Sequence, residues 1–266
     1  MTEGNEKKSL AEYKGKDRVI SSLEMEAVVT RESHSIFDVR SGIPSIDRYV
    51  DGFRDGEVYA VSGPTKNGKT LLAQTLTVNF AKQNAYSLWF TFEVPARQFL
   101  SQFDELPLFY MPTKLKTYAM DWLEERILES FAKYHTRIVF IDHLHYLFDM
   151  ARTRNTSLEI GTVIRKLKTI AVNNGFCIFL LCHTTKGKSD DNLSYESIRD
   201  SSFVSQESDC VLMVKRTPGK GSNRARCRIE FHRRTGVLEK VIELEKHGSY
   251  LRELSKQEEP EQWWQK

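Results

Sequence analysis

The chain has 266 residues, of which 40% are hydrophobic and 28% are charged. This balance is typical of a globular protein that can bury a core, and it excludes a disordered or fibrous chain. The net charge of +3 is too small to indicate nucleic-acid binding by itself, and no apolar run reaches the roughly 18 residues of a membrane-spanning helix, so we expect no membrane partner.

Residues 1–34 are predicted to form an N-terminal arm. The first 16 residues are polar and charged, and they lack the apolar stretch of a signal peptide. Residues 17–30 place Ile20, Leu23 and Ala27 on one side of a predicted helix. Such a helix packs either on its own domain or on a neighbouring subunit, and the sequence is compatible with both.

Residues 35–254 are predicted to form one α/β core, followed by a tail at 255–266. Residues 35–57 are rich in glycine and proline, which indicates a turn-rich entry. Five apolar runs are predicted to be buried strands: Val58–Val61, Ala85–Phe92, Arg137–Ile141, Cys177–Leu181 and Cys210–Val214. Four helical patterns separate them: Thr70–Lys82, Asp121–Tyr134, Leu158–Asn173 and Tyr195–Gln206.

Strands that alternate with helices predict a mostly parallel sheet with right-handed crossovers and helices on both faces. Residues 226–254 instead indicate two or three strands joined at Thr235-Gly236 and His247-Gly248, which favours an antiparallel edge. The four cysteines form no C-x-x-C pair, so we expect buried free thiols: Cys177, Cys182, Cys210 and Cys227.

The segment 62–70, SGPTKNGKT, contains the pattern G-x-x-x-x-G-K-T between a β-prone run and a helical pattern. Its glycines let the backbone wrap a phosphate, with the loop N–H groups directed at phosphate oxygens. An ordinary Gly/Lys surface turn is the alternative, but it does not need this strand–loop–helix context. We predict ATP binding by Gly63, Pro64, Thr65, Lys66, Asn67, Gly68, Lys69 and Thr70.

Two residues of this loop have predicted roles of their own. Lys69 is expected to face solvent as a point charge for the β- and γ-phosphates, and the Thr70 hydroxyl is expected to hold Mg²⁺. A helix that begins near Lys69 adds its positive end to the anion site.

Three further residues lie where predicted strands end. Asp142 closes the run RIVFID and is expected to hold Mg²⁺ through water, although an Asp that simply caps a strand is the alternative. Glu93 ends SLWFTFE and is a candidate acceptor for the proton of attacking water. His183 follows CIFLLC, where a histidine either contacts the γ-phosphate or has only a structural role.

These segments together resemble the RecA-like ATPase core of DnaB-type replicative helicases, from about Gly42 to Leu244. The similar segments, in order, are SGIPSIDRYVDGFRDGEVYAVSGPTKNGKT, TFEVPARQF, IVFIDHLHYL, EIGTVIRKLKTIAVNNGFCIFLLCHTTK and SIRDSSFVSQESDCVLMVKR. The resemblance implies that Glu93 is the catalytic base, that Asp142 binds Mg²⁺, and that His183 is the γ-phosphate sensor, as in phage and Twinkle-like members. His145 stands where the family usually has Gln.

The last family motif, K-x-R-x-G, is similar to FHRRTG here, with Phe231 in place of the Lys. The resemblance implies that Arg233 acts as an arginine finger on the neighbouring subunit, with Arg234 as a rival. If this stretch is a strand, the two arginines point to opposite faces.

The resemblance also implies a homohexameric ring with ATP sites between subunits and single-stranded DNA in its centre. Loops 151–157 and 186–193 would face the DNA, through Arg152, Arg154, Lys186 and Lys188, unless they are ordinary solvated loops. The basic stretch Lys215–Arg228 is a second candidate for DNA contact or a solvated turn.

We therefore predict an ATP-hydrolysing translocase on single-stranded DNA, the motor of a replicative helicase. Expected partners are primase, polymerase and single-strand binding protein, in a bacterial or phage-infected cytoplasm or a mitochondrial matrix. The resemblance does not extend to the amino-terminal domain associated with primase, which keeps open a RecA-like ATPase of recombination or helicase loading. A RecA-like signalling or clock-type ATPase that assembles on proteins is the other alternative.

Overall fold

The computed structural model describes residues 12–15, 18–31, 37–149, 155–183, 201–217 and 223–254. The chain divides into two compact units, Met1–Ile36 and Phe37–Lys266. The first unit contains helix α2 (Ser22–Arg31), which begins five residues after the start of the predicted helix 17–30 and ends one residue beyond it. Ser21 and Glu24 cap its start reciprocally, since the Glu24 amide donates to Ser21 Oγ and the Ser21 amide donates to Glu24 Oε2. Leu23 and Ala27 of the predicted apolar side are exposed.

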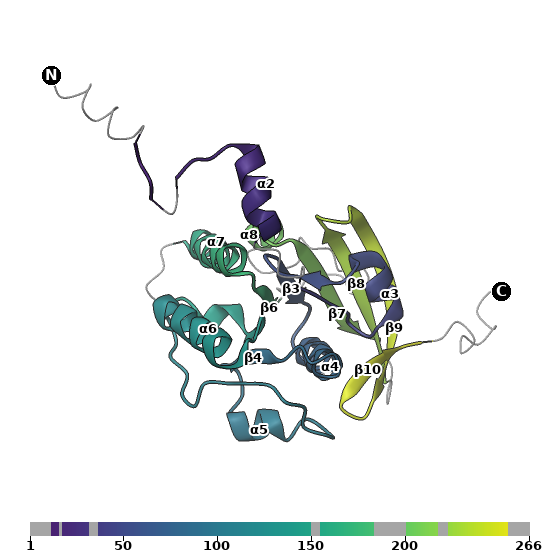
Figure 1. Cartoon of the computed structure of the whole chain (residues 1–266). Coiled ribbons are helices and arrows are strands. Elements are labelled where there is room, and N and C mark those ends of the chain that lie inside the picture. The colour runs from purple at the N-terminus through teal and green to yellow at the C-terminus, as the bar shows by residue number, and fades with distance from the viewer. Residues whose placement is uncertain are drawn as a thin grey trace. The chain divides into compact units, whose positions relative to one another are not determined.

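The second unit is built on an eight-stranded sheet whose order is β10-β9-β8-β7-β3-β6-β5-β4 (Figure 1). The strands from β7 to β4 in this order are parallel, and β8, β9 and β10 extend the sheet in antiparallel fashion. The strands are β3 (Val58–Ser62), β4 (Ser87–Thr91), β5 (Ile138–Asp142), β6 (Cys177–Leu181), β7 (Cys210–Arg216), β8 (Arg224–His232), β9 (Val237–His247) and β10 (Tyr250–Glu253).

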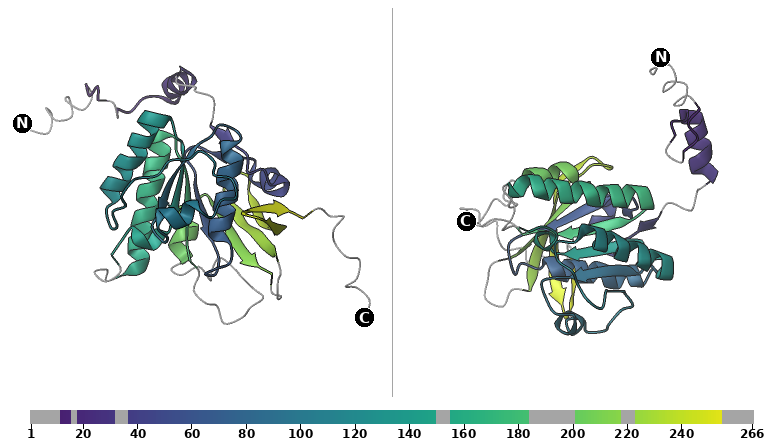
Figure 2. Two further views of the ribbon diagram at one scale, coloured as in Figure 1. Left: turned by 90° about the horizontal axis from the view of Figure 1, so that it is seen from below. Right: turned by 90° about the vertical axis from the view of Figure 1, so that its left-hand side faces the viewer.

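Helices cover both faces of this sheet, as Figures 1 and 2 show. The helices of the second unit are α3 (Pro44–Val50), α4 (Lys69–Ala81), α5 (Ala96–Leu100), α6 (Met120–Tyr134), the 3₁₀ helix η1 (Leu144–Tyr146), α7 (Thr156–Asn174) and α8 (Ser201–Glu207). A small antiparallel pair, β1 (Asp38–Val39) and β2 (Phe53–Arg54), lies within the entry segment. This architecture confirms the predicted α/β fold with its antiparallel C-terminal edge.

Alternate residues of each buried strand face two separate hydrophobic cores, as the period of two in a strand requires. Tyr59 and Val61 of β3 pack toward α3, α4 and α5, whereas Val58 and Ala60 pack toward α6, α7 and α8. Both faces of the parallel strands are therefore apolar, which explains why their sequences are continuous apolar runs instead of alternating ones.

A row of aromatic rings crosses the parallel strands on the α4 face. Tyr59 stacks on Phe179, Phe179 on Phe140, and Phe140 on Trp89, with ring centroids 5.1, 4.6 and 4.6 Å apart. Each such pair contributes about 0.5–1.5 kcal/mol beyond the area that it buries. The row links β3, β6, β5 and β4 side by side in the interior.

The predicted strands and helices agree with the structure within a few residues at each end. Helices α3 and α5 and the β1–β2 pair were not predicted, because their segments contain turn residues. Pro44 is in fact compatible with helix α3, because it lies in the first turn, where its missing N–H is not needed. Of the predicted helix Tyr195–Gln206, the structure shows α8 from Ser201, and residues 195–200 lie outside the described part.

All four cysteines are buried free thiols, as predicted, and burial raises the pKa of Cys182 and Cys227 to about 12. Within the described ranges, none of the helices combines the length and apolar character that crossing a bilayer requires.

Arg234 ties the β8–β9 hairpin to the entry segment of the core. Its Nε donates to Glu57 Oε1 at 2.8 Å, and its Nη2 donates to the carbonyl oxygens of Gly52 and Val50 at 2.8 and 3.1 Å. Burial alone would raise the pKa of Glu57, but His232, whose Nε2 lies 3.7 Å from Glu57 Oε2, and the hydrogen-bonded Arg234 outweigh it and lower this pKa to about 2. Arg234 therefore has a structural role within its own subunit.

We expect Arg234→Ala to lower the free energy of unfolding by about 2–4 kcal/mol, because the half-buried Glu57 carboxylate loses its guanidinium partner. Arg233→Ala is the matched control, with an expected loss of about 1 kcal/mol or less. Chemical denaturation of the two variants measures the difference, and equal losses would contradict this assignment.

Candidate functional site

The predicted site residues gather where the parallel strands end. Gly63 directly follows β3, Asp142 is the last residue of β5, and Glu93 and His183 lie two residues beyond β4 and β6. Parallel pairing in register, such as Thr91 beside Asp142 and Asp142 beside Leu181, aligns these ends at one edge of the sheet. Ligands of open α/β sheets bind at this edge.

The two glycines of the phosphate-loop motif have conformations that a side chain would not allow. Gly63 has φ +143°, and a Cβ atom there would lie 2.1 Å from the carbonyl oxygen of Val214 in β7. Gly68 has φ +98° and caps helix α4, which begins at Lys69 as predicted. The loop is therefore held against β7 while the helix N-terminus points toward the loop, an arrangement that favours an anion.

Lys69 is buried, which corrects the expectation that it faces solvent. Its side chain is 6% exposed, and Nζ donates to the carbonyl oxygens of Gly63 and Pro64 at 2.9 and 3.0 Å. Burial lowers the pKa of Lys69, while the nearby charges of Asp142 and Glu93 act in the opposite direction. The ammonium group is thus held under the loop by carbonyl oxygens, ready to exchange them for stronger anionic acceptors.

Thr70 and Asp142 meet directly, since Thr70 Oγ1 donates to Asp142 Oδ2 at 2.9 Å. Burial raises the pKa of Asp142 to about 6; the Thr70 hydrogen bond and Lys69 oppose that shift, and Glu93 adds to it. A hydroxyl and a carboxylate side by side are oxygen ligands of the kind that Mg²⁺ prefers. The residues present therefore fit the predicted magnesium site.

Glu93 is fixed beside Asp142 through the backbone. The amides of Phe92 and Glu93 both donate to the carbonyl oxygen of Asp142, at 2.8 and 3.3 Å. The Glu93 side chain is 39% exposed and lines a cleft of about 260 Å³, together with residues Thr65–Leu71, Val94, Gln102, Asp142 and His183. Larger cavities of about 640 and 650 Å³ lie beside α6 and beside β10, away from these groups. The smaller cleft is the candidate site because the predicted site residues line it.

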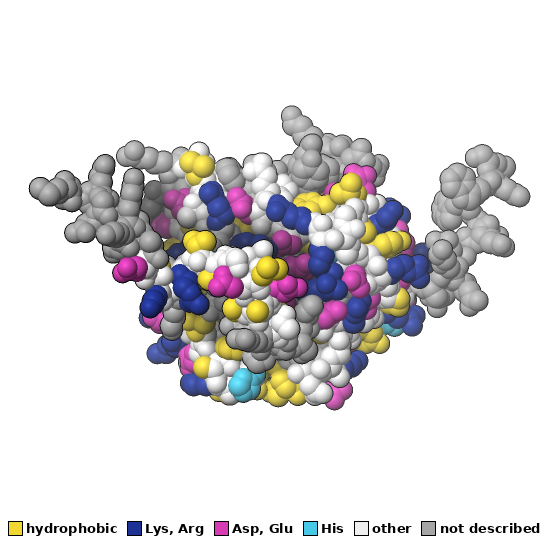
Figure 3. Space-filling view, turned by 45° about the horizontal axis from the view of Figure 1, so that its top comes forward, with side chains coloured by type: hydrophobic (Ala, Val, Ile, Leu, Met, Phe, Trp, Pro, Cys, Tyr) yellow, Lys and Arg dark blue, Asp and Glu magenta, His cyan; other side chains and the backbone are white. Residues whose placement is uncertain are grey.

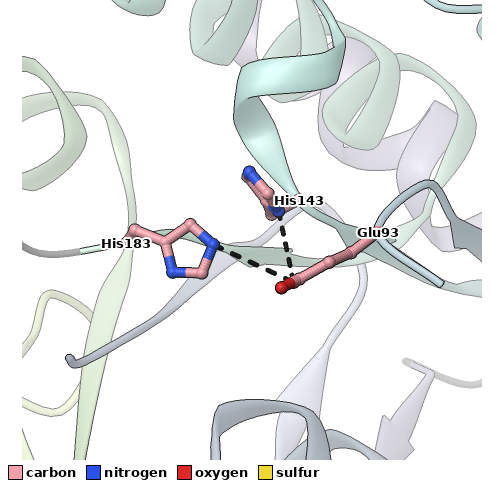
Figure 4. Close-up of side chains that lie close together, drawn as sticks. All are labelled: Glu93, His143 and His183. Atoms are coloured by element: carbon pink, nitrogen blue, oxygen red, sulfur yellow. Dashed lines mark ion pairs between the residues drawn. The ribbon is translucent and has the colours of Figure 1, made fainter. Parts of the chain in front are cut away.

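Two histidines face Glu93 from neighbouring strand ends, as Figure 4 shows. Nδ1 of His143 lies 3.4 Å from Glu93 Oε2, and Nε2 of His183 lies 3.9 Å from the same oxygen. Burial lowers the pKa of His143 to about 3 and that of His183 to about 4, with further lowering from Lys69, so both rings are neutral near pH 7. His143 was not predicted; the only signal is that it directly follows Asp142 in IDHLHYL.

Arg233 and Arg234 occupy the turn between β8 and β9, not a strand, so the expected alternation of faces does not apply. Arg233 Nη2 donates to the carbonyl oxygen of Gln206 at the end of α8. The predicted DNA contacts Arg152, Arg154, Lys186 and Lys188 lie outside the described residues.

The raised pKa of Asp142 predicts that Asp142→Asn stabilises the protein. The folded state binds the Asp142 proton more tightly than the unfolded state, so the contribution of this residue to stability falls as pH rises from about 4 to about 6. At pH 7 we expect Asp142→Asn to raise the free energy of unfolding by about 1–3 kcal/mol, and the gain to vanish near pH 3.5.

Denaturant titrations at both pH values measure this effect. Asp209→Asn is the matched control, because Asp209 accepts from the Val58 amide at 2.8 Å and pairs with Lys168 at 2.6 Å. Asp209→Asn is expected to destabilise the protein. If Asp142→Asn also destabilised it at pH 7, the pKa of Asp142 would not be raised by folding as described.

Two family models match the chain. The model described as the DnaB-like helicase C terminal domain matches residues 99–250, more than half of the chain. The model described as the KaiC ATPase matches residues 39–108, which include the phosphate loop and Glu93.

Two similar solved structures have the same fold, each with 17% sequence identity. One is described as a DnaB-like replicative helicase and its interactions with primase; the match covers 91% of this chain and 69% of that one, with a TM-score of 0.70. The other is described as an ATPase domain, with 89% and 100% coverage and a TM-score of 0.72. With the model match and the strand-edge site, they identify this RecA-like chain as a member of the DnaB-like helicase C-terminal domain family, whose members hydrolyse ATP.

Proposed function

We propose that this chain is the motor of a replicative DNA helicase, which moves along single-stranded DNA by hydrolysing ATP where two subunits of a homohexamer meet. The observation that carries the proposal is the meeting of Lys69, the Thr70–Asp142 pair, Glu93 and His183 at one edge of the sheet in a helicase-family chain. Each group supplies a different part of phosphoryl-transfer chemistry.

Residues 63–70 bind the phosphates through the loop amides and the N-terminus of α4. Lys69 releases the carbonyl oxygens of Gly63 and Pro64 and donates instead to phosphate oxygens. Thr70 and Asp142 hold Mg²⁺, which when bound neutralises charge on the phosphate oxygens. Asp142 must be ionised for this role. Because burial raises its pKa, ionising Asp142 costs free energy when the site forms.

Glu93 is the proposed catalytic base. Its carboxylate is exposed to the cleft and lies beside the Asp142 backbone, so it is placed to accept the proton of a water that attacks the γ-phosphate. His183 lines the same cleft as a neutral imidazole, which can donate one hydrogen bond to the γ-phosphate. Nε2 of His183 lies 3.9 Å from Glu93 Oε2, so the proposed sensor is next to the proposed base.

We expect a second subunit to complete the site with one of the two arginines of the β8–β9 turn. Arg234 is held by Glu57 within its own subunit. Arg233, which donates to a backbone carbonyl oxygen instead of a buried carboxylate, is therefore the better candidate for a finger that reaches a neighbouring site.

The support for single-stranded DNA comes from the family, because the four predicted contact residues lie outside the described part of the chain. The face in Figure 3 carries basic and acidic side chains interspersed, without a continuous field of one sign. In the β8 part of the basic stretch Lys215–Arg228, Arg226 pairs with Glu243 at 2.6 Å and Arg228 pairs with Glu239 at 3.1 Å. These two arginines already have acidic partners within the chain, so we propose the loops 151–157 and 186–193 as the DNA contacts, as the family resemblance implies.

One observation supports the alternative function, a clock-type ATPase that assembles on protein partners. It is the match of the KaiC model to residues 39–108. It ends before Asp142 and His183, whereas the helicase model includes both. Stimulation of ATP hydrolysis by oligo-dT separates these functions, and strand displacement separates a helicase from a DNA-binding ATPase of recombination or helicase loading. Primase, polymerase and single-strand binding protein are the proposed partners of the helicase.

We expect Glu93→Gln to bind ATP as the natural chain does and to lose oligo-dT-stimulated hydrolysis by at least about 10²-fold, because an amide cannot accept the water proton. Nucleotide binding is followed by fluorescence and turnover by phosphate release. Gln98→Glu, a change of the same size in the exposed part of α5, is the control. Wild-type turnover in Glu93→Gln would place the base elsewhere.

A shared site predicts rescue in mixed rings. Arg233→Ala and Lys69→Ala are each expected to be inactive, since a finger arginine is worth about 10³-fold or more in rate. Mixed together, they form some interfaces with both residues intact, so ATP turnover should rise above either variant alone. Because Lys69 is buried, cooperative unfolding of Lys69→Ala is checked first. If the subunits exchange and turnover does not rise, then one intact interface does not hydrolyse ATP by itself, which would contradict this prediction.

A further inference from the structure

The cluster of Glu93, His143 and His183 has the donor set of a transition-metal site. One ligand atom from each residue lies within 4.8 Å of the other two. The two imidazole nitrogens lie 3.4 and 3.9 Å from Glu93 Oε2. A tetrahedral ion with bonds of about 2.0–2.2 Å separates its ligands by about 3.4 Å. The two distances to Glu93 therefore lie at and about 0.5 Å above the value that such an ion requires.

The surroundings of the two rings support this use. Nδ1 of His143 and Nδ1 of His183 are buried, and neither has a hydrogen-bond partner within the described residues. The side chains of His143 and His183 are only 12% and 21% exposed, so their positions are set by packing, including their own edge-to-face contact at 4.2 Å. Figure 4 shows both rings directed at the Glu93 carboxylate. The cluster is thus preorganised from three strand ends.

We propose that Glu93, His143 and His183 bind a divalent ion of the zinc class, separately from the Mg²⁺ ligands Thr70 and Asp142. Two imidazoles and one carboxylate suit Zn²⁺ and leave a fourth position open, whereas Mg²⁺ prefers oxygen ligands. Lys69 is near enough to oppose a cation, and the carboxylates of Glu93 and Asp142 offset its charge. The two imidazole nitrogens are what make the site favour a zinc-class ion over Mg²⁺.

An ion bound here withdraws the Glu93 carboxylate from attacking water and holds His183 away from phosphate. Zinc-class ions then inhibit ATP turnover, and a chelator restores it. This inhibition rests on the function proposed above, in which Glu93 is the base, but binding of the ion does not. Binding is therefore the primary test.

The full chain, without nucleotide and with Mg²⁺ in excess, is titrated with Zn²⁺ by calorimetry and with Co²⁺ by visible absorption. We expect one ion per chain and a tetrahedral Co²⁺ spectrum. Glu93→Gln and His143→Ala should each raise the dissociation constant by at least about tenfold, since loss of even an outer-shell partner costs about 10–100-fold. Glu93 is partly exposed, so Glu93→Gln is expected to fold even if His143→Ala does not.

His247→Ala is the matched control, because His247 Nε2 lies 2.7 Å from Glu245 Oε2 in a second His–Glu pair on β9. It should leave both titrations unchanged. Absence of stoichiometric binding, or affinity that survives Glu93→Gln and falls in His247→Ala, would overturn the proposed site. Stoichiometric binding with full ATP turnover would overturn the inhibition and not the site.

Discussion

Parallel pairing of β3, β6, β5 and β4 is the constraint on which the site depends. Strands that run in the same direction end at the same edge, so residues far apart in sequence, from Gly63 to His183, come together there. Backbone hydrogen bonds continue past the strands, since the amide of Cys182 donates to Val61 and that of Phe92 donates to Asp142. The position of each chemical group is therefore fixed by the sheet itself.

The site is unfavourable in electrostatic terms, and the core beneath it compensates. Lys69 and Asp142 are both nearly inaccessible to water, and burial disfavours the charged form of each. Their mutual attraction recovers only part of that penalty, as the raised pKa of Asp142 indicates. The aromatic row from Tyr59 to Trp89 lies on the same strands and supplies apolar stabilisation that does not depend on charge. Function and stability thus reside in different parts of the same strands.

Two arginines and two aspartates lie in contrasting environments in this fold. Arg234 is enclosed by Glu57 and backbone carbonyl oxygens, whereas Arg233, one residue earlier in the same turn, is bonded to the end of α8. Asp209 is held by Lys168 and a strand amide, whereas Asp142 is held by a hydroxyl and faces the cleft. In each pair the residue with strong internal partners has a structural role, and the other is the one to which we assign a functional role in the proposal.

Local sequence patterns were enough to predict the α/β fold, the bounds of the buried strands within a few residues, and the phosphate loop with Asp142, Glu93 and His183 at strand ends. These features are encoded locally, in continuous apolar runs, helical periodicity and a motif of fixed spacing. The tertiary structure alone decided that Lys69 is buried, that His143 joins Glu93 and His183, and that Arg234 is anchored to Glu57. Each of these depends on which strands become neighbours, and burial and pairing of side chains between neighbouring strands follow from long-range contacts that no local pattern specifies.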